Sequence, residues 1–131
     1  MADTILYDSA MRLFGDLVTQ EVSADAERGA WPDRLWRAVE EAGYPGVLAE
    51  GAAGMAEAVT ILRAAGLHAA PIPLAETMLA RWLCAACEIE APAGALTISP
   101  VEPEDRLDIA EAAVSGHAGY ILGDAKLRPS C

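Results

Sequence analysis

Two prolines separated by one residue, Pro71 and Pro73, interrupt a stretch that is otherwise rich in alanine and leucine. Proline has no backbone N–H, and its ring disfavours the helical conformation of the residue before it. A helix that precedes this corner must therefore end before Ala70, and a new helix begins only after Pro73. The sequence thus predicts two separate helices, over residues 55–66 and 74–88, joined by a tight corner.

The composition favours a mainly α fold. The chain has 131 residues, enough for one domain with a core of its own. Hydrophobic residues make up 53% of it, but aromatic residues only 5%, so aliphatic side chains must fill the core. Alanine is the strongest helix former, because it loses no side-chain entropy when a helix forms.

Helical periodicity is also present in two earlier segments. Residues 4–21 place apolar side chains at i, i+4, i+7 and i+11, starting from Leu6. Residues 32–42 begin with Pro32, which suits the first turn of a helix, and are followed by Gly43, which tolerates the left-handed conformation of a helix end. Both segments are therefore predicted to be helices.

The intervening segments lack this periodicity. Residues 23–30 are polar and predict a loop with at most one helical turn. Residues 47–54 are glycine-rich and predict a connecting loop, since they lack the Gly-Lys-Ser/Thr ending of a phosphate-binding loop.

Apolar spacing predicts which side chains turn inward. For the helix before the corner, the predicted inward face is Met55, Val59 and Leu62. For the helix after it, the predicted inward face is Leu74, Met78 and Trp82, widened by Leu79 and Leu83. We expect all three tryptophans, Trp31, Trp36 and Trp82, to anchor the core rather than to stack on a ligand.

The pattern changes after residue 92. Residues 96–99 and 107–109 alternate apolar and polar side chains, as half-buried strands do. Residues 116–119 are predicted to form a hairpin turn between strands at 112–115 and 120–122.

The predicted fold class is therefore a helical bundle of four or more helices over residues 1–92, followed by a short C-terminal β tail over residues 93–131. Two or three short strands are marginally stable alone, and their open edges need a partner.

The net charge of −11 argues against two classes of partner. Such a surface repels the phosphates of nucleic acids and of anionic membranes, so we expect neither as a partner. The sequence shows neither a secretory signal nor a long uninterrupted apolar stretch, which leads us to expect a cytoplasmic protein.

The cysteines predict free thiols rather than a metal or redox site. Cys84 and Cys87 are one helical turn apart, and the third cysteine, Cys131, makes the count odd. Zinc needs four ligands, and the two histidines, His68 and His117, lie far from this pair in the sequence. We therefore expect buried thiols and no metal site.

Three stretches resemble acyl-CoA dehydrogenases, over a span of about residues 7–107. Residues 35–47, LWRAVEEAGYPGV, resemble the second helix and the following turn of that family. Residues 63–77, RAAGLHAAPIPLAET, resemble its helix–corner–helix, and residues 96–100, LTISP, the first strand of its middle domain. Where the family typically has a loop of the form x-P-E-x-x-G-G, residues 49–54 read AEGAAG, without the proline or the paired glycines.

The resemblance implies an oxidoreductase of fatty acid metabolism that binds FAD and an acyl-CoA thioester between three domains. In that family a glutamate removes the α-proton and the β-hydrogen leaves as hydride to the flavin. We expect this chain to supply the N-terminal helical domain and the start of the middle β-domain, without the glutamate base. We accordingly assign no catalytic and no cofactor-binding residue, and expect the isolated chain to be inactive. A homo-oligomer or a partner chain would supply the missing domains.

The resemblance also implies substrate-binding residues. By position, Val59, Arg63 and Leu67, spaced i, i+4 and i+8, would face the far end of the acyl chain. Arg63 in that place would suit a short or polar acyl tail. The alternative is that Val59 and Leu67 are core residues and that Arg63 is a solvated surface charge.

Two other functions fit the sequence. One is a stand-alone helical module that self-associates, covering its tail strands and its Met, Trp and Leu faces with a second copy. The other is a small acyl-carrier or acyl-CoA-binding domain without redox chemistry.

Overall fold

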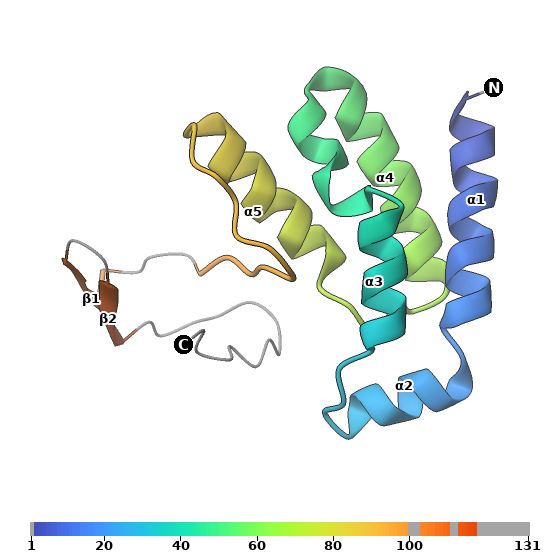
Figure 1. Cartoon of the computed structure of the whole chain (residues 1–131), viewed down its shortest axis with the longest axis horizontal. Coiled ribbons are helices and arrows are strands. Elements are labelled where there is room, and N and C mark those ends of the chain that lie inside the picture. Colours follow the sequence, from blue (N-terminus) through green and yellow to red (C-terminus); the bar gives the residue numbers. More distant parts are fainter. Residues whose placement is uncertain (1, 100–102, 111–112, 118–131) are drawn as a thin grey trace.

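The computed structural model describes residues 2–99, 103–110 and 113–117. Within these residues, helices precede one antiparallel pair of strands (Figure 1). The elements are α1 (Ala2–Leu17), α2 (Gln20–Glu27), α3 (Asp33–Glu41), the 3-10 helix η1 (Tyr44–Glu50), α4 (Ala52–Leu67), α5 (Leu74–Ala86), β1 (Arg106–Ala110) and β2 (Ala113–His117). The predicted mainly helical fold class is confirmed.

The helices form an array with α1 and α5 at its two ends (Figure 1). Helix α4 packs against α1 on one side and against η1 on another, while α5 packs mainly on η1. Helix α3 contacts both α1 and η1. The 3-10 helix thus contacts α3, α4 and α5, and joins α5 to the rest of the array.

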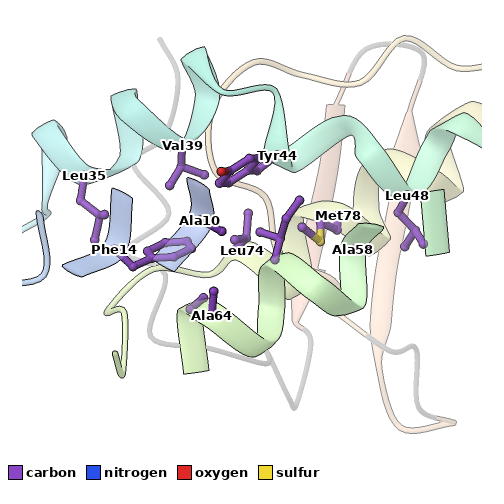
Figure 2. Close-up of a cluster of buried hydrophobic side chains, with 12 residues drawn as sticks. Ala10, Phe14, Leu35, Val39, Tyr44, Leu48, Ala58, Ala64, Leu74 and Met78 are labelled. Carbon is purple, nitrogen blue, oxygen red and sulfur yellow. The ribbon is translucent and has the colours of Figure 1, made fainter. Parts of the chain in front are cut away.

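The core lies where these elements meet (Figure 2). Its most buried side chains are Ala10, Phe14, Leu35, Val39, Ile61, Ala64, Leu74 and Met78. The rings of Phe14 and Tyr44 bring α1 and η1 together, with centroids 6.4 Å apart. As the composition predicted, aliphatic side chains and alanines fill most of this space.

The backbones of α4 and η1 approach each other closely at Gly54, in the first turn of α4. A Cβ atom at this position would lie 2.0 Å from the carbonyl oxygen of Val47 in η1, so only glycine fits. The prediction that residues 47–54 form a connecting loop was therefore wrong. Apart from Gly51, they belong to η1 and the start of α4, because buried Tyr44, Pro45 and Leu48 hold the 3-10 helix against its neighbours.

The first predicted helix is divided. Helix α1 ends at Leu17, and α2 occupies Gln20–Glu27, where a loop was predicted over much of its length. Thr19 causes the division: its backbone is extended, and its Oγ1 accepts a hydrogen bond from the backbone N–H of Val22 at 3.2 Å. This is an N-cap, which starts a new helix even in a polar segment.

The proline corner separates α4 from α5, as predicted. Helix α4 ends in a Schellman motif, in which the N–H of Ala70 donates to the carbonyl of Ala65 at 3.0 Å and that of Ala69 to Gly66 at 3.1 Å. Ala69 adopts a left-handed φ of 48°, a place usually taken by glycine. The chain therefore turns within six residues and re-enters a helix directly after Pro73.

Residues 96–99 are not a strand, contrary to the prediction. The backbone N–H of Leu96 donates to Oγ1 of Thr77 at 3.0 Å, and this hydroxyl donates in turn to the carbonyl of Pro73 at 2.7 Å. Thr77 is fully buried in α5. Its side chain binds the segment after the helix, so the Leu96 backbone bonds to a helix side chain instead of a neighbouring strand.

Strands β1 and β2 pair antiparallel, with Leu107 opposite Gly116 and Arg106 opposite His117. Gly116 and His117 thus lie within strand β2. The prediction that these two residues belong to a hairpin turn at 116–119 was therefore wrong. The strand predicted at 120–122, and much of the β tail predicted over residues 93–131, fall outside the described residues.

We expect Gly54→Ala to lower the free energy of unfolding by about 3 kcal/mol, because the added methyl group overlaps the Val47 carbonyl and must push α4 away from η1. The matched control is Gly66→Ala in the same helix, where no atom lies within 4 Å of the added Cβ. That control should gain about 0.5–1 kcal/mol from its higher helix propensity. Urea unfolding followed by circular dichroism measures both; equal effects would contradict the close approach.

Thr77→Val should lower the free energy of unfolding by about 1–2 kcal/mol, because it leaves the Leu96 N–H without its acceptor. Thr77→Ser keeps the hydroxyl and serves as the control. Amide hydrogen exchange separates the two variants, since Leu96 should exchange faster in the valine variant and at the wild-type rate in the serine variant. Unchanged exchange in Thr77→Val would show that the hydroxyl does not hold this segment.

Candidate functional site

The three residues predicted to bind substrate lie on the exposed side of α4. Val59 and Leu67 are 57% and 62% exposed, and Arg63 is exposed as well. The alternative that Val59 and Leu67 are core residues was therefore wrong, and so was the predicted inward face at Met55 and Val59. The buried side of α4 instead consists of small residues and one isoleucine: Gly54, Ala58, Ile61, Ala64 and Ala65.

Two of the three predicted residues meet in one hollow between α1 and α4. Its lining residues are Asp3, Thr4, Tyr7, Val59, Thr60 and Arg63, and its volume is about 270 Å³. Leu67 lies one turn further along α4 and does not line it. The contribution of α1 was missed by the sequence prediction, because nothing in the local pattern of residues 3–7 indicates that they face α4.

Arg63 is held across this hollow by an aromatic ring. Its guanidinium carbon lies 5.5 Å from the centroid of the Tyr7 ring, a cation–π arrangement that ties α4 to α1. The Arg63 side chain is thus exposed, as the solvated-charge alternative expects, but its orientation is set by the Tyr7 ring. Next to it, the hydroxyl of Thr60 donates to the carbonyl of Ala56 at 2.9 Å, so only its oxygen lone pairs are available to a ligand.

The hollow is too small and too open to enclose a cofactor by itself. Ligand pockets are typically about 300–1,000 Å³ and bury most of the ligand surface. This hollow holds about 270 Å³ on the outside of two helices. The residues that line it therefore cannot surround a flavin or an acyl chain unless another surface closes over them.

A second hollow lies between the end of α1 and α3. It has a volume of about 550 Å³, and four of its lining residues are charged: Asp33, Arg34, Arg37 and Glu41. Two arginines and two carboxylates line it, so the hollow has no net charge with which to attract an anion. No sequence motif indicated it, and its chemistry favours no ligand class.

The tryptophans are only partly in the core. Trp36 is 6% exposed and was predicted correctly, whereas Trp31 and Trp82 are 44% and 45% exposed. Trp31 packs against Trp36 at the start of α3, with ring centroids 5.7 Å apart and the ring planes tilted by 57°. Trp82 belongs to an exposed apolar side of α5, together with Leu79 and Leu83, which were also predicted to turn inward.

Cys84 and Cys87 are both free thiols, but only Cys84 is partly buried and Cys87 is exposed. His68 ends α4, with its Nδ1 atom 3.0 Å from the carbonyl oxygen of Ala64. In the part of the chain that the structure describes, no group of three or more metal-ligating side chains comes together. Nor does any helix in that part have the length and apolar character needed to cross a membrane.

Comparison with models of known protein families gave no match, and searches of curated proteins and of solved structures gave none either. The resemblance to acyl-CoA dehydrogenases therefore rests on residues 35–47, 63–77 and 96–100 alone.

We expect Tyr7 and Arg63 to be energetically coupled by about 0.5–1 kcal/mol, as cation–π pairs at exposed sites are. A double-mutant cycle of Tyr7→Leu and Arg63→Ala measures this coupling from the free energies of unfolding. The control cycle pairs Tyr7→Leu with Arg34→Ala, which lies on α3, and should give no coupling. Zero coupling in the first cycle would mean that Arg63 is a freely solvated charge.

Proposed function

We propose that the chain is the N-terminal helical part of an acyl-CoA dehydrogenase-like flavoprotein, which catalyses FAD-dependent α,β-dehydrogenation of an acyl-CoA thioester. The observation that carries this proposal is the corner between α4 and α5. Residues 63–77, which resemble the family's helix–corner–helix, span the last turn of α4, the proline corner and the first turn of α5. This is the helix–corner–helix arrangement that the resemblance implies.

In this proposal the hollow between α1 and α4 receives the far end of the acyl chain. Val59 offers an apolar contact, while Arg63 places a positive charge near that end. Burying a charge beside a long hydrocarbon is costly, so the site suits a short or polar acyl group. The flavin and the proton-abstracting base are assigned to a partner chain or to further domains, because the described residues do not enclose a cofactor.

The second candidate function is a helical interaction module. One observation favours it: α5 exposes Leu79, Trp82 and Leu83 on the side that faces away from the core. An acyl-CoA-binding module without redox chemistry has less support, because the hollow that would hold the ligand is open.

The proposal is tested on the chain purified together with its native partners. We expect this complex to show flavin absorbance that is bleached by a short acyl-CoA under anaerobic conditions, while the recombinant chain alone is colourless and inactive. A native complex without flavin would contradict the proposal. Calorimetry of the recombinant chain with a short and a long acyl-CoA tests the binding module. That function predicts heat of binding from at least one of the two ligands, and no heat from either would contradict it.

A further inference from the structure

Helix α5 is apolar on two opposite sides. Leu74, Thr77 and Met78 are buried against η1 and the core. On the other side lies what we call the outer face of α5, made up of Ala75, Leu79, Trp82, Leu83 and Ala86. Its three large side chains are 42–46% exposed. A helix that is hydrophobic all round is normally covered on all sides, so the outer face is suited to a partner.

Among the described residues of α5 and of the turn that follows it, every charged side chain except Arg81 is acidic. Helix α5 contains a single basic residue, Arg81, whose Nη2 donates to the carbonyl of Gly94 at 3.4 Å and lies 3.5 Å from Oε1 of Glu40. This side chain is therefore occupied by the chain's own groups and is only 25% exposed. At the two ends of the outer face lie carboxylates instead, Glu76 in the first turn and Glu88 just after the helix.

We propose that the outer face of α5 docks an amphipathic helix of a partner protein whose apolar stripe is bordered by lysine and arginine. Leu79, Trp82 and Leu83 follow the i, i+3 and i+4 spacing that forms a ridge on a helix, which fits the groove of a second helix. Basic side chains beside the partner's stripe would meet Glu76 and Glu88. This attraction speeds the encounter and disfavours acidic partners.

A second copy of the chain fits this face less well. Antiparallel pairing of two α5 helices would bring Glu76 of one copy toward the Glu88 end of the other, between two chains that each carry a net charge of −11. Repulsion of like charges opposes such a dimer, whereas a basic helix is attracted. The inference concerns this surface alone and does not depend on flavin chemistry.

Two synthetic helical peptides with the same leucine stripe test the proposal. In one peptide all positions outside the stripe are lysine, and in the other they are glutamate. Each is titrated into the full, isotope-labelled chain and followed by NMR. We expect the lysine peptide to shift the resonances of Leu79, Trp82 and Leu83 and to bind more weakly as salt screens the charges. The glutamate peptide should not bind.

Matched variants separate docking from general attraction to an acidic protein. Leu79→Ser with Leu83→Ser should weaken binding of the lysine peptide more than tenfold, while Met55→Ser with Val59→Ser should leave it unchanged. Both pairs are exposed, so both variants should fold. Glu76→Gln with Glu88→Gln should weaken binding and reduce its salt dependence.

Several results would overturn the proposal. Equal loss of binding in the two serine variants, or no loss in either, would mean that the peptide does not recognise the outer face of α5. Binding of the glutamate peptide would show that charge does not select the partner. A concentration-dependent dimer abolished by Leu79→Ser with Leu83→Ser would assign the face to a second copy. Binding of neither peptide would also overturn it, and none of these results bears on the flavin in the native complex.

Discussion

The approach of α4 to the 3-10 helix at Gly54 is the constraint on which the rest of the helical array depends. Because the backbone of α4 lies directly against the carbonyl of Val47, η1 is fixed beside α4, and α5 packs on η1 in turn. Thr77 of α5 then binds Leu96. One close contact between two backbones therefore sets the position of α5 and, through it, the direction in which the chain leaves the helices.

The helix ends could be predicted from sequence more easily than the helix faces. Proline and glycine act locally, so the corner at Pro71 and the stop at Gly43 were found correctly. Which side of α4 turns inward depends on its neighbours, and here small residues allow the close approach while Met55 and Val59 remain outside. Hydrophobic periodicity assigns the largest apolar side chains to the core, and it fails where a helix packs through alanine and glycine.

The candidate site shows the same limit. Val59 and Arg63 are four residues apart on one helix, so their proximity could be predicted from spacing alone. Tyr7 and Asp3 join them only because α1 packs against α4, a tertiary contact without a local signal. The exposure of Trp82 was likewise unpredictable from its own segment, since every residue type in α5 except Glu76 and Arg81 is compatible with a buried position.

The two surfaces to which we assign roles lie apart. The hollow lies between α1 and α4, and the outer face belongs to α5, at the opposite end of the array from α1 (Figure 1). A single docked helix that covers Trp82 and Leu83 would therefore leave Arg63 and Tyr7 uncovered. If the hollow receives an acyl chain, a second surface must close over it, so the acyl site and the outer face of α5 would be covered by two different segments of the partners.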